Sequence, residues 1–287
     1  MPRWAGIAVL LAVATTFGGN HIAARIAFAH GANVTTAVAF RSTGTAVVLF
    51  FLLLLSGVSF KVNARTGGRA VLVGLLVASQ SYCLYSAVAI IPVALALLAF
   101  QTFPMVLALS SWASGAERPS RSALVAMPIA LVGLSLALDV WGKGGGEIGA
   151  GVAWALAASL SFAAALFLMT RWLGAIDGRL RSFLTMSVVA AVILAGGAAA
   201  GDYRLPADAT GWIAIGALTL LYGIAITAVF VLLPRLGAVN NAAVLNFEPI
   251  AVLALAWPIL GQAVAPLQIA GAFIVVGAIA WMGSASR

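Results

Sequence analysis

Apolar runs of about 20 residues recur along the whole chain, and each is long enough to cross the roughly 30 Å hydrocarbon core of a bilayer as a helix. They are rich in Ala, Gly, Leu and Val and lack the alternating polarity of barrel strands, so each predicts a helix. The runs lie at residues 4–28, 34–56, 69–91, 93–114, 121–139, 149–170, 181–201, 209–233, 239–261 and 265–284. The sequence therefore predicts an all-α integral membrane protein with ten transmembrane helices.

The first run has features of a secretory signal. Arg3 precedes it, and Ala27-Phe28-Ala29 resembles a cleavage site. Against that interpretation, the run is longer than a signal core and has a repeat partner at 149–170. We expect a transmembrane helix here, with a signal as the alternative.

The two halves of the sequence repeat each other with a constant offset. The matched residues are Gly6 with Gly151, Phe17 with Phe162, Pro104 with Pro249 and Trp112 with Trp257, and every pair is 145 residues apart. We assign 1–141 to a first five-helix repeat, 142–148 to a Gly-rich outer loop and 149–287 to a second five-helix repeat.

An odd number of helices in each repeat inverts the second repeat relative to the first. Inverted repeats are common in secondary transporters, because the two halves can exchange conformations and open a central site to either side. The alternative is that duplication only enlarged a helical bundle, as in some channels and membrane enzymes.

Basic residues sort to one side of the predicted membrane. Eleven fall in cytoplasmic positions if the N-terminus is inside: Arg3, Lys61, Arg65, Arg69, Arg118, Arg121, Arg171, Arg179, Arg181, Arg235 and Arg287. Only Lys143 and Arg204 fall outside. This positive-inside bias predicts that both termini are cytoplasmic, and it explains the net charge of +8 without nucleic acid.

Several functional classes find no support in the sequence. No Gly-x-x-x-x-Gly-Lys-Ser/Thr motif is present, so ATP hydrolysis is not expected. One cysteine, Cys83, and two histidines give no pattern for a disulfide or a zinc site. A single acid within the spans gives no paired carboxylates for a protease. We expect no enzyme activity, no cofactor and no metal.

Weak motifs along nearly the whole chain resemble the drug/metabolite transporter superfamily and its EamA-type repeats. The first repeat has Phe17-Gly-Gly-Asn-His-Ile-Ala-Ala-Arg25, Phe40-Arg41, and Pro104 followed by Gly115-Ala-Glu117; the second has Pro249 followed by Gly261-Gln262. Phe17 replaces a common Trp, and Gln262 replaces a common Glu. The resemblance implies a ten-helix exporter of the bacterial inner membrane, with the YddG-type aromatic amino acid exporters as the nearest likeness.

Two charged residues inside the spans are the main candidates for a binding site, because a charge in hydrocarbon is costly unless it meets protein or a water-filled cavity. Glu248 is the only carboxylate in a predicted helix interior and is a candidate for proton transport. Arg41 is a candidate to bind a substrate carboxylate in two hydrogen bonds. A pair between Arg41 and Glu248, or caps on neighbouring carbonyls, remains an alternative.

Other polar and aromatic residues within the spans complete the candidate site, with helix packing as their alternative role. They are Asn20, His21, Tyr82, Tyr85, Gln101, Trp154, Ser161, Tyr222, Asn241 and Asn246. Pro104 and Pro249 are candidate hinges, since each is predicted to remove a helical hydrogen bond at the same place in its repeat.

The predicted function is export of small metabolites, above all aromatic or neutral amino acids, by alternating access, with protons as a potential coupling ion. The alternatives are a drug, purine or sugar carrier of the same fold, and an uncoupled channel or lipid-handling bundle.

Overall fold

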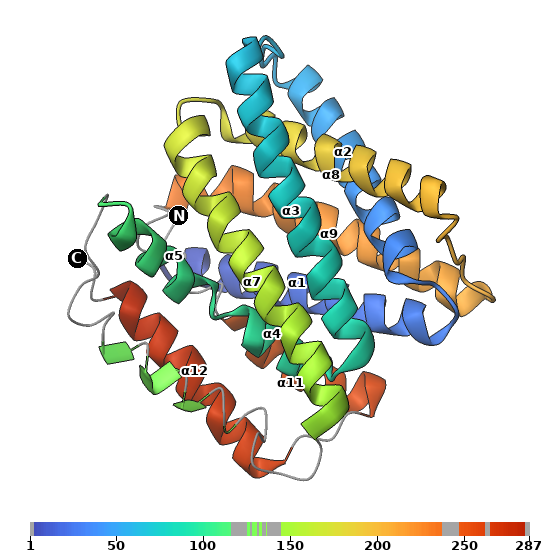
Figure 1. Ribbon diagram of the computed structural model, residues 1–287, viewed down its shortest axis with the longest axis vertical. Coiled ribbons are helices and arrows are strands. Elements are labelled where there is room, and N and C mark those ends of the chain that lie inside the picture. Colours follow the sequence, from blue (N-terminus) through green and yellow to red (C-terminus); the bar gives the residue numbers. More distant parts are fainter. Residues whose placement is uncertain are drawn as a thin grey trace.

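The computed structural model describes residues 3–115, 125–126, 128–130, 132–133, 136, 145–236, 247–261 and 265–284. All regular structure in these ranges is helical (Figure 1). The helices are α1 (Arg3–Ala29), α2 (Val34–Leu55), α3 (Ala64–Ile90), α4 (Val93–Phe100), α5 (Phe103–Ala113), α7 (Gly145–Leu173), α8 (Gly178–Ala200), α9 (Ala209–Leu236), α11 (Glu248–Leu260) and α12 (Pro266–Ser284).

Six segments within the described residues are long and apolar enough to cross a membrane. They are Val34–Leu55, Ala64–Ile90, Val93–Ala113, Gly149–Leu173, Gly178–Ala200 and Ala209–Ile226. Shorter apolar helices cover Glu248–Leu260 and Pro266–Ala278. The chain is therefore an integral membrane protein, while the predicted runs at 121–139 and 239–261 lie partly outside the described residues.

Helix boundaries follow the sequence repeat. Corresponding boundaries, each 145 residues apart, are the ends of α2 and α8 at Leu55 and Ala200, the starts of α3 and α9 at Ala64 and Ala209, and the starts of α5 and α11 at Phe103 and Glu248. α7 differs from the prediction at its first turn, because it begins at Gly145, inside the loop predicted at 142–148.

The two repeats interlock through their helices. α1 packs on α9 and α11, and in the matching arrangement α7 packs on α3, α4 and α5. α2 and α8 pack on each other, and Figure 1 shows α3 and α7 running side by side. Each of these contacts joins a helix of one repeat to a helix of the other, so a large part of the core lies between the two halves.

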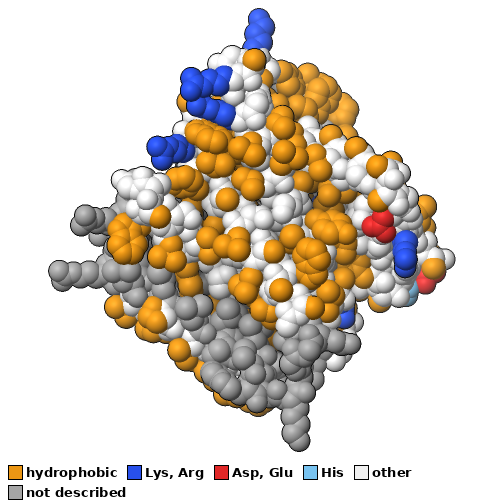
Figure 2. Space-filling model, viewed as in Figure 1, with side chains coloured by type: hydrophobic (Ala, Val, Ile, Leu, Met, Phe, Trp, Pro, Cys, Tyr) orange, Lys and Arg blue, Asp and Glu red, His pale blue; other side chains and the backbone are white. Residues whose placement is uncertain are grey.

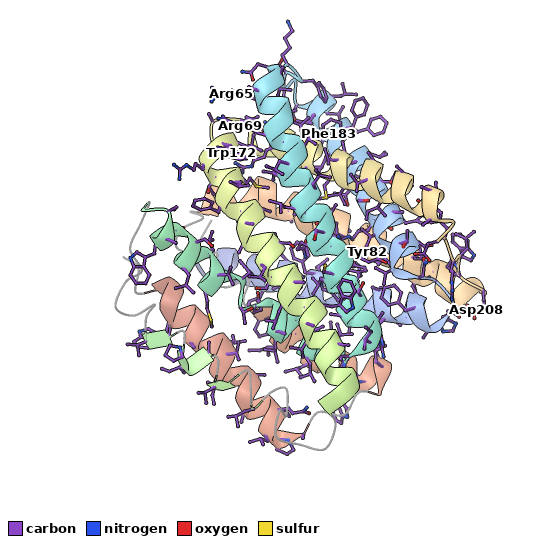
Figure 3. The ribbon with its side chains drawn as sticks, in the orientation of Figure 1. Arg65, Arg69, Tyr82, Trp172, Phe183 and Asp208 are labelled. Atoms are coloured by element: carbon purple, nitrogen blue, oxygen red, sulfur yellow. The ribbon has the colours of Figure 1, made fainter. Side chains whose placement is uncertain are left out.

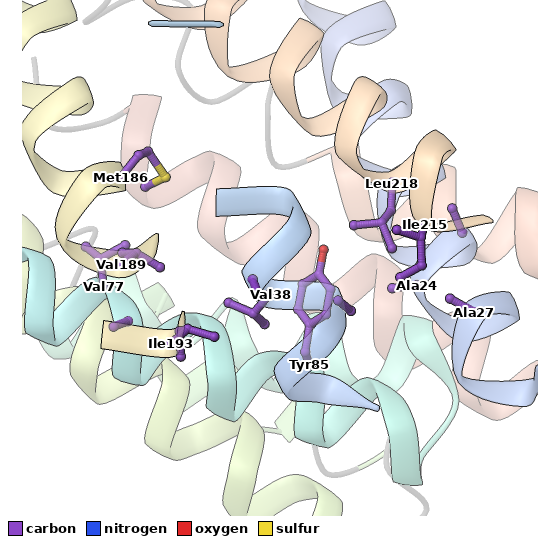
Figure 4. Close-up of a cluster of buried hydrophobic side chains, with 14 of the residues drawn as sticks. Ala24, Ala27, Val38, Val77, Tyr85, Met186, Val189, Ile193, Ile215 and Leu218 are labelled. Carbon is purple, nitrogen blue, oxygen red and sulfur yellow. The ribbon is translucent and has the colours of Figure 1, made fainter. Parts of the chain in front are cut away.

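One apolar cluster joins both repeats around a buried tyrosine. Tyr85 of α3 is fully buried, with Val38 of α2, Val189 of α8 and Leu218 of α9 in the same cluster (Figure 4). Other large apolar side chains face outward, and orange covers much of the surface in Figure 2. This surface suits a chain whose solvent is lipid over most of its area.

Charged residues gather at the ends of the helices. Figure 3 places Arg65 and Arg69 near one end of the molecule and Asp208 at another. In Figure 2, Lys and Arg side chains gather in the upper part, and acidic side chains lie at the right beside a further basic side chain. Which of these ends faces the cytoplasm stays a prediction.

Gly74 brings α3 close to α8. A Cβ on Gly74 would lie 2.5 Å from Cβ of Val188, so we expect Gly74→Ala to destabilise the fold by about 1–3 kcal/mol through overpacking. Thermal unfolding in detergent measures this change. Gly196→Ala on α8 is the matched control, because a Cβ there meets no heavy atom within 4 Å and should leave stability unchanged or slightly raised. Equal unfolding temperatures for the two variants would contradict close α3–α8 packing.

Candidate functional site

Arg41 lies between two tyrosine rings at the interface of the repeats. Its guanidinium carbon is 4.7 Å from the ring centroid of Tyr85 on α3 and 4.1 Å from that of Tyr222 on α9. The side chain is buried, while the preceding residue, Phe40, is 42% exposed on the outer face of α2. Two cation–π contacts, worth roughly 0.5–2 kcal/mol each, therefore stabilise a charge that lipid alone would not accommodate.

Hydrogen bonds fix the orientation of the guanidinium. Arg41 Nη2 donates to Ser81 Oγ at 2.7 Å, and Nη1 makes a long contact of 3.5 Å with the Tyr85 hydroxyl. That hydroxyl in turn donates to Asn20 Oδ1 on α1 at 2.9 Å. Arg41, Tyr85, Ser81 and Asn20 thus form one buried network across α1, α2 and α3.

Unpaired polar atoms remain inside this network. Arg41 Nε, Asn20 Nδ2 and His21 Nδ1 are buried and have no hydrogen-bond partner among the residues that the structure describes. The first two are donors, and buried donors without acceptors cost about 1–3 kcal/mol each. Among the described residues, no carboxylate forms an ion pair with Arg41. The network therefore has positive charge, and within the described residues two of its donors, Arg41 Nε and Asn20 Nδ2, have no acceptor.

Glu248 pairs with His21 instead of Arg41. His21 Nε2 lies 3.3 Å from Glu248 Oε1, with the side chains 6% and 22% exposed. The His21 ring is 5.7 Å from the Tyr85 ring, centroid to centroid, so this pair borders the arginine network. α1 supplies the histidine and α11 the carboxylate, so the pair spans the two repeats.

A helix break lies beside Pro104, and it corrects the role predicted for the prolines. α4 ends at Phe100, Gln101 and Thr102 form a turn, and α5 begins at Phe103. Pro104 and Pro249 both occupy the first turn of their helices, where the missing N–H costs nothing. They therefore start helices and do not remove a bond from a helix interior. Their use as hinges stays a prediction.

Gln101 is buried at this break, and the buried hydroxyls of Thr102 and Ser159 lie 2.8 Å apart beside it. This contact joins the break to α7. Discontinuous helices of this kind mark the centre of many transporters.

Three predicted residues lie together in a separate group between α3 and α7. Tyr82 meets Trp154 edge to face at 6.3 Å, and Ser161 Oγ is 3.2 Å from Ser79 Oγ. Figure 3 shows Tyr82 on α3, beside α7. Within the described residues, no hydrogen bond or ring contact links these three residues to Arg41, although Tyr82 packs on the apolar cluster that contains Tyr85. Asn241 and Asn246 lie outside the described residues.

Sequence reasoning chose Tyr85, which lies in the Arg41 network, but missed Ser81 on the same face of α3. Ser81 and Tyr85 are four residues apart and share one helix face, whereas Tyr82 lies about 100° away from Ser81. A serine in an apolar helix is unremarkable by itself. Its spacing from Tyr85 is the signal that would have identified it.

Tyr85→Phe tests the network without changing the ring. Because it removes the acceptor of Arg41 Nη1 and the donor to Asn20 Oδ1, we expect a loss of about 1–3 kcal/mol in unfolding free energy. Unfolding in detergent measures it. Tyr82→Phe is the control, since its hydroxyl makes no hydrogen bond to a described residue, and an equal loss in both variants would contradict the network.

The interlocked repeats, the broken helix and the buried polar network at their interface define the class as a membrane transporter built by duplication. Comparison with known proteins gives the family. The chain belongs to the EamA-like transporter family, whose model matches residues 4–138 and again residues 149–284. The two matches begin 145 residues apart, which is the offset of the sequence repeat.

A solved structure titled "Crystal structure of protein" shares the fold. It superposes with a TM-score of 0.67 at 18% sequence identity, and the alignment covers 96% of each chain. No curated protein matches the chain. The family establishes a transporter of small molecules, and the residues of the site carry the argument for its substrate.

Proposed function

We propose that the chain is a secondary transporter that exports amino acids, aromatic or neutral, across the bacterial inner membrane. Its ten helices form two inverted repeats with both termini in the cytoplasm, and the substrate occupies a central site that opens to each side in turn. The predicted charge sorting and the discontinuous helix α4–α5 support this arrangement.

The observation that carries the substrate class is the buried guanidinium of Arg41, which forms no ion pair with a carboxylate in the described part of the chain. Its Nε and the Nδ2 of Asn20 are free donors in one network, so the missing ligand is an acceptor with negative charge. A substrate carboxylate supplies both properties and takes two parallel hydrogen bonds from an arginine.

The surroundings of the Arg41 guanidinium bear on how a ligand can bind. The rings of Tyr85 and Tyr222 both pack on the guanidinium, with its carbon 4.7 and 4.1 Å from the ring centroids, and the Nε edge has no hydrogen-bond partner among the described residues. A planar carboxylate lying in the guanidinium plane fits that edge, and Arg binds carboxylates in this geometry. Phe17 packs edge to face on Tyr222 at 5.9 Å and adds aromatic surface for an apolar side chain.

His21 and Glu248 are the proposed proton-binding groups. An imidazole and a carboxylate can each bind and release a proton, and these two lie 3.3 Å apart. Proton binding changes the charge beside Arg41 and so changes the site's affinity for an anion. The pair also joins α1 to α11, which lets protonation affect the contact between the repeats.

Other carriers and uncoupled proteins remain the competing functions. A drug, purine or sugar carrier of the same fold would not need a free anion site, whereas a channel would show flux linear in the gradient. A lipid-handling bundle would show neither saturation nor competition among water-soluble solutes.

The test is uptake into proteoliposomes of labelled phenylalanine, tryptophan, threonine, a purine and a cationic dye, each with unlabelled competitors. We expect saturable movement of the amino acids alone, with accumulation when a proton gradient is imposed. Transport of only the dye or the purine would contradict the substrate class. Flux that never saturates would contradict a carrier.

A further inference from the structure

Two loops from different repeats are joined by hydrogen bonds at one end of the molecule. Segment 30–35 comprises the loop between α1 and α2 and the first two residues of α2, and segment 202–208 lies between α8 and α9. We call this bonded pair of segments the polar latch. Its backbone bonds run from Ala207 N to His30 O at 2.8 Å and from Asn33 N to Arg204 O at 3.2 Å. The predicted orientation places both loops on the outer side.

Asp202 is the centre of the side-chain bonds in the polar latch. Its carboxylate accepts from Asn33 Nδ2 at 3.0 Å and from Thr35 Oγ1 at 2.8 Å, and its backbone carbonyl accepts from Asn33 Nδ2 at 2.7 Å. Asn33 also caps α2 through Thr36 N, and Thr35 is buried. Loss of the Asp202 carboxylate would therefore remove the acceptor of Thr35 Oγ1 and leave Asn33 Nδ2 only the backbone carbonyl.

A second carboxylate closes the other end of the latch. Asp208 Oδ2 lies 2.7 Å from His30 Nδ1, and Asp208 Oδ1 accepts from Gly211 N at the start of α9. The Gly211 N–H and the His30 side chain hold the pKa of Asp208 below its ordinary value. This carboxylate therefore stays ionised, and able to accept both bonds, at neutral pH.

The opposite end of the molecule is joined differently, although the repeat supplies equivalent loops there. By the 145-residue offset, Asp202 corresponds to Gly57, Asn33 to Gly178 and Thr35 to Leu180, so the polar side chains are replaced. No hydrogen bond connects 56–63 with 174–177, both of which the structure describes. Phe60 contacts Phe183 of α8 there, with ring centroids 5.7 Å apart.

The contrast between the two ends is physical. Hydrogen bonds are directional and are lost when donor and acceptor separate by about 1 Å, whereas packed aromatic rings tolerate sliding. The polar latch is also absent from the shared repeat pattern, so it is not needed to form either repeat. Its bonds resist separation of α1–α2 from α8–α9.

We propose that the polar latch is the outer gate of the carrier and that Asp202 is the residue that holds it shut. The proposal rests on the proposed function for the existence of a transport path, and on the predicted orientation for placing the latch on the outer side of the membrane. Opening toward the outside then requires segments 30–35 and 202–208 to separate.

Hydrogen exchange of the latch amides tests the bonds without any substrate. In nanodiscs, Asp202→Ala should raise the exchange rate of the peptides covering both segments by at least tenfold, and Thr35→Val should give a smaller rise. Asp177→Ala is the control, because Asp177 bonds only within its own loop and α8, to Arg179. Unchanged exchange of segment 30–35 in Asp202→Ala and Thr35→Val overturns the proposal.

Cross-linking tests whether the latch must open. His30→Cys with Asp208→Cys, in a Cys83→Ala background, is treated with a short reducible bifunctional thiol reagent. Phenylalanine exchange should fall at least tenfold after cross-linking and recover after reduction. In each single cysteine variant, treatment with the same reagent should not change the rate. Full transport in the cross-linked protein overturns the gate.

The two proposals fail in different ways. If the uncross-linked protein transports none of the solutes tested, the proposed function fails. Hydrogen exchange alone then tests whether Asp202 stabilises the latch. If it transports phenylalanine and the cross-link has no effect, the function stands and the gate is overturned.

Discussion

Arg41→Lys is expected to lower kcat/KM for carboxylate-bearing substrates by about 30- to 150-fold. Lysine keeps the charge but loses the planar fork that donates two parallel hydrogen bonds to a carboxylate, an interaction worth about 2–3 kcal/mol. Substrate amides, which carry no anion, should lose much less. Initial rates of uptake into proteoliposomes for phenylalanine and phenylalanine amide give the comparison.

Arg69→Lys is the matched control for that experiment. Arg69 also lies over an aromatic ring, with its guanidinium carbon 5.5 Å from the centroid of Trp172, but it is outside the buried network. Its replacement should leave both rates unchanged. If Arg41→Lys reduces acid and amide transport equally, the arginine supports the fold and does not bind the carboxylate.

Glu248→Gln is expected to abolish proton-driven accumulation while leaving exchange of labelled for unlabelled substrate. Glutamine keeps the shape and can still accept a hydrogen bond from His21, but it cannot bind and release a proton. The variant should therefore lose proton-driven accumulation and keep substrate exchange only if Glu248 carries the coupling proton. A pH-sensitive dye inside the vesicles measures proton entry alongside substrate movement.

Asp177→Asn provides the control for the loss of a carboxylate, because Asp177 caps α8 and lies outside the network. The Arg179 side chain that bonds Asp177 holds the pKa of this carboxyl below its ordinary value. We expect no effect on proton coupling from this change. Coupled uptake that survives in Glu248→Gln would assign Glu248 a structural role and leave the coupling ion, if any, elsewhere.

The fold was predictable because lipid allows few solutions. A chain of apolar runs must satisfy its backbone within helices, and a constant offset between residues such as Pro104 and Pro249 identifies the repeat. The family match over both repeats and the paired helix boundaries confirm the two-repeat architecture. The orientation of the termini and the count of ten helices stay predictions.

The site was predictable in part, for the same reason. Arg41, Asn20 and Tyr85 stand out because polar groups in hydrocarbon are rare, and the structure brings them together. Their partners depend on helix rotation and on contacts between distant segments, which a periodic pattern does not determine. Ser81 was therefore missed, and Tyr82 was grouped with Tyr85 although it contacts Trp154.

The prolines show a limit of another kind. A proline in an apolar run indicates either a kink or a helix start, and the sequence does not distinguish them. The turn at Gln101 and Thr102 shows that Pro104 lies at the start of α5 and not at a kink within a helix.

Within the described residues, the buried network of Asn20, Arg41, Ser81 and Tyr85 comes from the first repeat, whereas Tyr222 and Glu248 beside it come from the second. In the proposed alternating-access cycle, the residues of the first repeat move together, while the Tyr222 ring that packs on the guanidinium moves with the second repeat. Under that proposal, we expect the site to bind substrate with different affinities in the inward-open and outward-open forms. The gradients alone set the final distribution of solute, but unequal affinities set how readily each side loads and unloads, and the proposed carrier would then work faster in one direction than in the other.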